Sequence, residues 1–262
     1  CYAHGMRTTL PLLLLAATLL AAPRPAAAMD ADTTIALAFE RGHFIVFDHD
    51  RPVASERYVC DRVADSLQIT AVAERRMRGA DGTEKTYRKT AGLVLGAREH
   101  ELRRYTVNVL FEGRTSVRGV IPGDTTMTVY SEDEKGGVSD RIPQPPGRFT
   151  ILDPMVFTWF DQMFRTLNGR VIGSRTVSIL TLGQQASTSE ATVSVDGTDR
   201  ITWGGKPLVT TRWTMRDDNV RFIVWTDPDG HMLRLEQPES GLLVMREEPA
   251  PPRRRTPTPK RR

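Results

Sequence analysis

The stretch formed by residues 153–169, DPMVFTWFDQMFRTLNG, constrains the fold of this chain more than any other. Asp153 is a favourable helix N-cap and Pro154 suits the first helical position. Asn168 and Gly169 form a stop signal. At helical spacing the apolar residues cover an arc of about 200°, which is wide for a helix on a protein surface. We therefore expect a concave apolar surface that receives this helix.

The segments on both sides of this helix have the patterns of β-strands. Residues 105–111, YTVNVLF, alternate between apolar and polar positions, as in a half-buried antiparallel strand. The segment 227–230, DPDG, predicts a tight hairpin turn. By contrast, residues 131–146 are acidic and then rich in Gly and Pro, which predicts a long loop. The chain is thus expected to be mainly β. We predict a single antiparallel, strongly curved sheet, a half-barrel or open barrel, with one apolar helix packed on its concave face.

Residues 1–28 have the features of an upstream extension followed by a cleavable signal peptide. An apolar run at 10–22 follows Arg7, and it is too short to span a bilayer. Three small residues at 26–28 suit a cleavage site. We therefore expect residues 29–249 to form a single β-rich domain in the periplasm.

Charge is concentrated at the end of the chain. The chain has 36 Lys+Arg and 32 Asp+Glu, and six of its basic residues lie in the last ten positions. The body is therefore weakly acidic, and no nucleic-acid contact is expected. Residues 250–262 are predicted to be a disordered basic Pro/Arg tail. Its cations would attract an anionic membrane surface. The candidate contact residues are Arg253, Arg254, Arg255, Lys260, Arg261 and Arg262.

Motifs for catalysis are missing from the sequence. It contains no G-x-S-x-G elbow, H-E-x-x-H, phosphate-cradling glycine loop or C-x-x-C, and its histidines lack metal-ligand spacing. We therefore expect no metal, no cofactor and no enzymatic activity. The least implausible nucleophile is Cys60, with His100 as its base and Asp153 as the orienting acid. Cys60 ends a predicted strand rather than beginning a helix, so a structural thiol is the preferred interpretation.

Aromatic residues supply the candidate binding site. Three tryptophans fall in consecutive predicted strands, and four further aromatics lie on the helix. A strongly curved sheet closed by one helix can leave space that side chains do not fill. The alternative is an ordinary filled core. The candidate lining residues of an apolar cavity between sheet and helix are Phe157, Trp159, Phe160, Phe164, Trp203, Trp213 and Trp225.

Three motifs carry a resemblance to a known group of proteins. They are FIVFDHDRPVASERY at 44–58, DPMVFTWF at 153–160 and FIVWTDPDGHMLRLE at 222–236. The chain resembles uncharacterised periplasmic β-rich domains of Gram-negative bacteria, which are broadly similar to lipoprotein-carrier half-barrels of the LolA and LppX type. The resemblance implies a concave face, covered by helices, that binds acyl chains. It implies no catalytic residues.

These observations predict a secreted, non-enzymatic periplasmic domain. It would bind a lipid or another apolar or amphipathic small molecule between sheet and helix. The alternative is an interaction or scaffolding module of the cell envelope with a filled core. A Cys60-dependent hydrolase or transferase is the third hypothesis. The oligomeric state is left open.

Overall fold

The computed structural model describes residues 40–79, 82–98, 100–145, 149–169, 173–182, 186–218 and 220–248. Within these ranges the chain forms one 15-stranded sheet and one α-helix, α2 (Thr158–Leu167). The predicted signal peptide at 1–28 and the predicted tail at 250–262 lie outside the described residues.

The strands follow one another in space in the order β8-β7-β6-β5-β4-β3-β2-β1-β15-β14-β13-β12-β11-β10-β9. The first eight have the bounds β1 (Glu40–Asp48), β2 (Arg51–Val63), β3 (Ser66–Arg78), β4 (Glu84–Gly96), β5 (Leu102–Phe111), β6 (Arg114–Pro122), β7 (Thr126–Asp133) and β8 (Gly136–Pro143). The others are β9 (Phe149–Leu152), β10 (Ser174–Leu182), β11 (Ala186–Trp203), β12 (Lys206–Arg216), β13 (Arg221–Thr226), β14 (Met232–Gln237) and β15 (Leu242–Arg246).

The sheet is open and mixed, so the prediction of a purely antiparallel sheet is wrong. Its order ends at β8 on one side and at β9 on the other. Strand β9 pairs in parallel with β10, for example Ile151 with Leu180. Helix α2 lies between these two strands in the chain, and a helical crossover of this kind brings the second strand back in the direction of the first.

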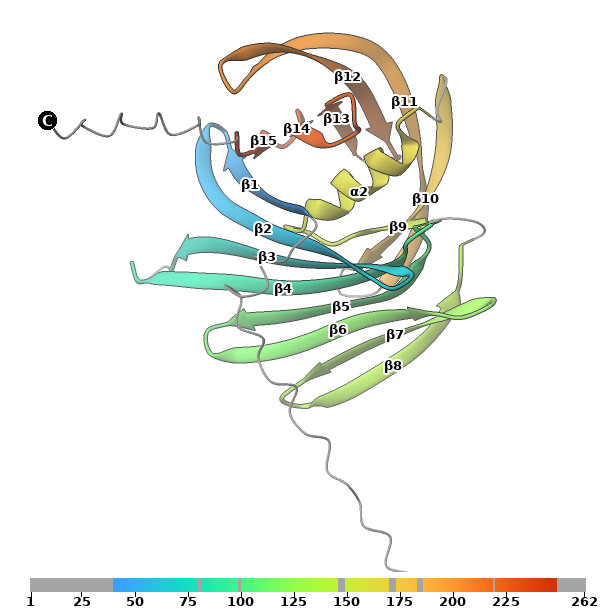
Figure 1. Ribbon diagram of the computed structural model, residues 1–262. Helices are drawn as coiled ribbons and strands as arrows, with labels where there is room; N and C mark the ends of the chain where they lie inside the picture. The colour runs from blue at the N-terminus through green and yellow to red at the C-terminus, as the bar shows by residue number, and fades with distance from the viewer. Residues whose placement is uncertain are drawn as a thin grey trace, which may run out of the picture.

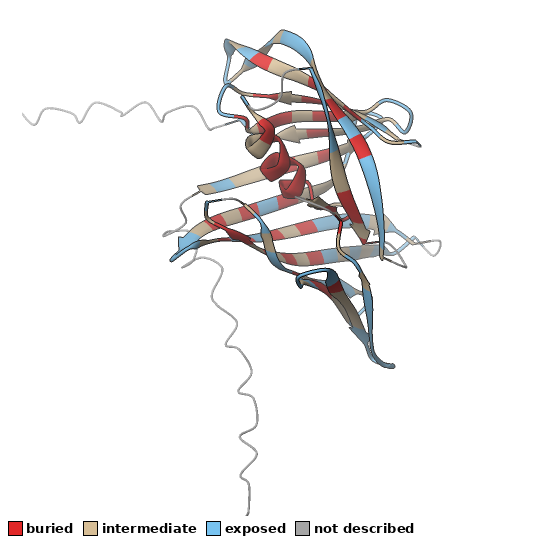
Figure 2. Cartoon of the chain, turned by 90° about the vertical axis from the view of Figure 1, so that its right-hand side faces the viewer, coloured by how far each residue is buried: buried red, intermediate tan, exposed pale blue. Residues whose placement is uncertain are grey.

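Helix α2 lies inside the curve of the sheet (Figure 1). Figure 2 shows it as mostly buried, facing strands that alternate between buried and less buried positions. Burial extends beyond the predicted apolar arc, because Thr158, Asp161 and Gln162 are buried as well. The polar side of this helix therefore faces the interior, and its hydrogen bonds must be made there.

The helix begins at Thr158, four residues later than the end of the predicted Asp153-Pro154 cap. Residues 153–156 form a turn instead, in which the Val156 N–H donates to the Asp153 carbonyl at 3.0 Å. Glu56 of β2 takes over the capping role. Its carboxylate accepts the backbone N–H of Phe157 at 2.5 Å and that of Thr158 at 3.2 Å. A buried helix terminus needs an acceptor for its free N–H groups, and here a distant strand supplies it.

The prediction of a long loop at residues 131–146 is wrong for most of that segment. Residues up to Asp133 belong to β7, and Gly136–Pro143 form β8, paired with β7 in a hairpin. Strand β8 is an edge strand whose side chains are nearly all exposed. It therefore lacks the apolar alternation by which a strand is recognised. No helix in the described part of the chain is long and apolar enough to cross a membrane.

Candidate functional site

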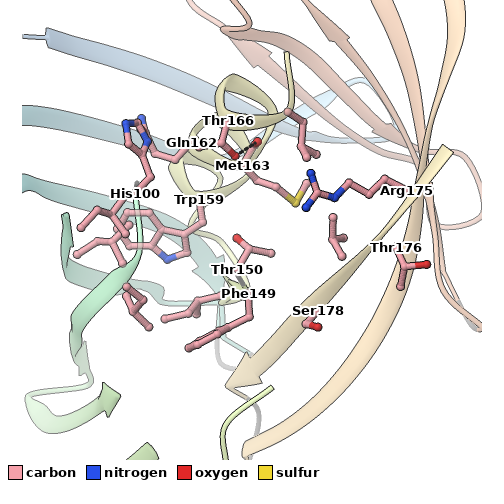
Figure 3. A pocket seen from close by; sticks show the side chains of 16 residues that line it. His100, Phe149, Thr150, Trp159, Gln162, Met163, Thr166, Arg175, Thr176 and Ser178 are labelled. Carbon is pink, nitrogen blue, oxygen red and sulfur yellow. Dashed lines mark hydrogen bonds between the residues drawn. The ribbon is translucent and has the colours of Figure 1, made fainter. Parts of the chain in front are cut away.

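A pocket of about 110 Å³ opens between one side of α2 and strands β4, β9 and β10 (Figure 3). For comparison, a cavity of about 150 Å³ holds one benzene molecule, and drug-sized ligands occupy about 300–1,000 Å³. The space in this open pocket thus fits a small group or one end of a chain. Its apolar walls come from Leu93, Leu95, Leu102, Phe149, Ile151, Trp159, Met163, Leu167 and Val177.

Gln162 is a buried polar residue beside this pocket. The residue is only 4% exposed, and its Oε1 has no hydrogen-bond partner among the described residues. Its Nε2 donates to Asp161 Oδ2 at 3.5 Å. This contact supports the amide orientation, because the flipped amide would place an oxygen against a carboxylate. A buried acceptor without a donor is costly.

Arg175 of β10 places a positive charge at the mouth of the pocket. It pairs across the strands with Val193, and Val177 pairs with Ala191. Val193 and Ala191 are buried, so Arg175 and Val177 share the inner face of the sheet. In Figure 3 the Arg175 side chain extends from β10 toward the helix. Among the described residues, none that line the pocket is acidic, and no carboxylate forms an ion pair with Arg175.

Five of the seven aromatic candidates lie around α2, but only Trp159 lines the pocket. The other four fill the core. The ring centroids of Phe160 and Phe222 are 5.2 Å apart, and those of Phe164 and Trp213 are 5.5 Å apart. Phe157 stacks on Phe160. The filled-core interpretation therefore describes these four residues.

The remaining two, Trp203 and Trp225, do not lie between sheet and helix. Val224 and Thr226 are fully buried, so strand alternation directs Trp225 to the opposite face of the sheet. There its Nε1 donates to Asp199 Oδ2 at 2.8 Å, and its ring lies 5.1 Å from the Arg234 guanidinium carbon. Trp203 borders a separate hollow on β11, with Leu233 and Met245 among its other lining residues.

A buried charged network connects α2 to strands β1, β14 and β15. Asp161 is fully buried, and its Oδ1 accepts Arg246 Nη2 at 2.6 Å and the Met232 N–H at 2.7 Å. Glu40 accepts Arg165 Nη1 at 2.6 Å. Ligand atoms of Glu40, Asp161 and His231 lie within 4.8 Å of one another. The two arginines already neutralise both carboxylates, so a metal dication would meet a site with no spare negative charge.

The proposed Cys60 nucleophile is in an unsuitable environment. The side chain is buried, and burial raises the pKa of its thiol to about 11. A thiol with that pKa is protonated at neutral pH and is a poor nucleophile. Asp153, its proposed orienting acid, forms an ion pair with Lys89 and accepts the Tyr105 hydroxyl.

The sequence reasoning missed the buried residues Gln162 and Glu56 and the exposed Arg175 beside the pocket. Arg175 and Gln162 carry no local signal, since each sits in a segment where polar residues are ordinary. Glu56 had one. It lies between Ala54 and Tyr58 on the face of β2 that turns toward the core. A carboxylate at an inward position of a strand is unusual.

Glu56 predicts a pH dependence of stability. Burial raises its pKa from 4.5 to about 7, against the opposing effect of hydrogen bonds from Thr158 and Phe157. A raised pKa means that the fold favours the protonated form, so its contribution is complete below about pH 4.5 and lost as the pH rises through 7. We expect the stability of the wild type relative to Glu56→Gln to fall by about 3 kcal/mol between pH 4.5 and about pH 8. Urea unfolding at each pH measures it, and a constant difference would contradict the prediction.

Comparisons with known proteins give a likeness of fold and nothing more. No protein-family model and no curated protein matches the chain. A beta-barrel-like protein of the domain of unknown function DUF1849 from Brucella abortus superposes with a TM-score of 0.53 and 9% identity, over 80% of this chain and 95% of that one. A DUF1089 family protein from Pseudomonas aeruginosa superposes with a TM-score of 0.44 and 10% identity, over 71% of this chain and 90% of that one. The first likeness agrees with an open, barrel-like β fold.

Proposed function

We propose that this protein is a secreted, non-enzymatic periplasmic domain that binds a small apolar or amphipathic molecule in the pocket beside α2. The observation that carries the proposal is a pocket beside α2 whose walls are largely apolar, with Trp159, Met163 and Leu167 of the helix among its lining residues. The periplasmic part rests on the signal-like sequence of residues 1–28. The pocket volume supports the end of a chain rather than a whole lipid.

The alternative is an envelope interaction or scaffolding module. Its support is the ring packing on the other side of α2, where Phe157 stacks on Phe160, Phe160 contacts Phe222, and Phe164 contacts Trp213. In either case the basic residues 253–262 would add a weak contact with an anionic membrane surface.

Filling the pocket should abolish binding. Val177 lies on the inner face of β10 and lines the pocket, so Val177→Trp places an indole where the ligand would sit. Saturation-transfer NMR with 1-octanol is expected to detect binding by the wild type and none by this variant. Val209→Trp is the matched control, because Val209 is 51% exposed and is not a lining residue.

A second variant keeps the test decisive if Val177→Trp fails to fold. Val177→Ala enlarges the same pocket, and it should bind 1-octanol at least as well as the wild type. A wild-type protein with a native circular dichroism spectrum that does not bind 1-octanol would support the scaffolding alternative.

A further inference from the structure

We infer that the outer face of strands β1, β13, β14 and β15 docks on the surface of an anionic lipid bilayer, with the basic residues 253–262 as a second point of attachment. The inference goes beyond the proposed function, which places a small molecule on the opposite face of the sheet. It takes from that proposal only the contact between the basic residues and a membrane. We call the apolar side chains of this face the outer patch, and they are Ile45, Phe47, Ile223, Trp225, Leu243 and Met245.

Strand alternation places the outer patch on the side of the sheet away from α2. Val46, Val224 and Val244 are buried in the core, and the residues before and after them along each strand point to the opposite face. Every residue of the outer patch is a direct neighbour of one of these three valines in the chain. All six side chains are partly exposed, and in the described part of the chain none of them packs against the core. The outer patch is thus an apolar surface that meets solvent.

Apolar side chains are not typical of the outward face of this sheet. Along β3 the outward positions include Gln68, Thr70, Glu74 and Arg76, as expected for a sheet with one face in water. In the outer patch, by contrast, the two residues of β1 lie directly opposite the two residues of β15, so their apolar surface is continuous. A continuous exposed apolar patch marks an interaction site.

The outer patch continues into the hollow beside Trp203. Residues 199–203 of β11 and 206–210 of β12 pair with each other and with no third described strand. In Figure 1 this two-stranded arm arches over β13, β14 and β15 on the side away from α2. The hollow of about 310 Å³ beneath it is lined by Ile201, Trp203, Leu233 and Met245 among others. Because Met245 belongs to the outer patch as well, the apolar surface extends from the sheet to the arm.

The basic residues 253–262 are attached next to the outer patch. Arg253 follows Arg246, the last residue of β15, by seven positions. Seven residues reach at most about 25 Å, so the six positive charges stay near any surface that the outer patch contacts. One apolar contact holds a protein on a bilayer only weakly, whereas an apolar contact combined with a polybasic segment gives stable attachment.

The charges around the outer patch suit a bilayer better than a second copy of this chain. Lys206 pairs with Trp203 at the tip of the arm, and Arg200 is exposed on the same arm. Trp together with Lys or Arg is typical of the boundary between lipid and water. Arg234 and Glu236 of β14 form an ion pair with each other, so together they add no net charge to the face. A second copy docked on this face would bring two sets of six basic residues together, and like charges repel.

Vesicle binding tests the docking face on the secreted chain without residues 1–28, whose apolar run would bind lipid by itself. The wild type is expected to co-sediment with vesicles of phosphatidylglycerol and phosphatidylcholine, and much less with vesicles of phosphatidylcholine alone. Phe47→Thr combined with Leu243→Thr should weaken binding to the anionic vesicles about 10-fold, because it removes apolar surface without a change in charge. Threonine also keeps a preference for strands.

The matched control removes two apolar side chains elsewhere on the outward side. Leu110 on β5 and Ile121 on β6 are 44% and 47% exposed. Each follows a partly or fully buried valine that faces the core side, so each points outward. Leu110→Thr combined with Ile121→Thr should bind the anionic vesicles as the wild type does.

A third variant tests the basic residues. Replacing all six by glutamine should weaken binding at least about 100-fold and remove the dependence of binding on salt. The substitutions, made together, are Arg253→Gln, Arg254→Gln, Arg255→Gln, Lys260→Gln, Arg261→Gln and Arg262→Gln.

Fluorescence quenching gives a measurement on the folded wild type that does not depend on the stability of any patch variant. Phosphatidylglycerol with brominated acyl chains should quench the tryptophan fluorescence of the wild type. Trp203→Phe combined with Trp225→Phe should lose most of this quenching, because the remaining Trp159 and Trp213 are buried around α2.

The outcomes separate this inference from the proposed function. Equal vesicle binding by the wild type and the Phe47→Thr, Leu243→Thr variant, or no quenching of the wild type, would overturn the docking face and leave only the contact of the basic residues. No vesicle binding by the folded wild type would overturn both. A wild-type dimer in light scattering that becomes a monomer in this variant would assign the outer patch to a second copy and also overturn the inference. The variant should bind 1-octanol as the wild type does, so a failure of all proteins to bind 1-octanol counts against the proposed function alone.

Discussion

Replacing Asp161 by alanine is expected to lower the free energy of unfolding by about 3–5 kcal/mol. Asp161 is fully buried and balances the charge of Arg246, whose side chain is only 12% exposed. The substitution leaves that guanidinium without its carboxylate, and the backbone N–H of Met232 without its acceptor. An uncompensated buried charge is among the most costly changes that a single substitution can make. Urea unfolding followed by circular dichroism measures the loss.

Two controls test the physical reason for this loss. Asp229→Ala removes an aspartate from an exposed turn and should change stability by less than about 0.5 kcal/mol. The double substitution Asp161→Leu with Arg246→Met removes both charges, and it should recover part of the stability lost in Asp161→Ala. An unfolding midpoint of Asp161→Ala equal to that of the wild type would show that α2 is not held by this network.

Replacing Phe164 by alanine is expected to cost about 3–5 kcal/mol. The side chain is fully buried on α2, and its ring centroid lies 5.5 Å from that of Trp213 on β12. Removing it takes apolar surface out of the contact between helix and sheet and leaves a cavity beside Trp213. The denaturant midpoint should shift strongly while the slope of the transition stays unchanged.

The matched control is Phe111→Ala. Phe111 lies at the end of β5, is only partly buried and contacts Tyr87 at 5.9 Å between ring centroids. It should lose less than half as much stability as Phe164→Ala, because water already reaches part of its surface. Equal losses in the two variants would contradict the placement of α2 at the centre of the fold.

Helix α2 shows which structural features local sequence patterns can predict and which they cannot. Its wide apolar arc predicted a helix inside a concave β surface, and one buried helix lies inside one curved sheet. Its first turn was predicted wrongly, because Asp153-Pro154 satisfies the local rules for a cap. In the fold, Asp153 pairs with Lys89 and Tyr105 instead. A local capping preference of about 1 kcal/mol is smaller than the cost of leaving a buried lysine unpaired.

Strand pairing shows the same limit. Alternation identified most strands, because it reports which face of a strand is buried. It does not report which strands are neighbours, so the parallel pairing of β9 with β10 had no sequence signal. Strand β8 was missed because an edge strand with two exposed faces needs no apolar alternation.

The candidate site depended on tertiary structure almost entirely. Of the predicted aromatic residues, Trp159 is among those that line the pocket, whereas Trp203 and Trp225 lie on another face of the sheet. Amino-acid sequence determined the fold class and the burial of the helix, because apolar periodicity follows from the geometry of each element alone. Only the tertiary structure brought Arg175 and Gln162 to one pocket. Their meeting depends on the curvature of the sheet and the position of α2 across it, which result from contacts between residues far apart in the chain.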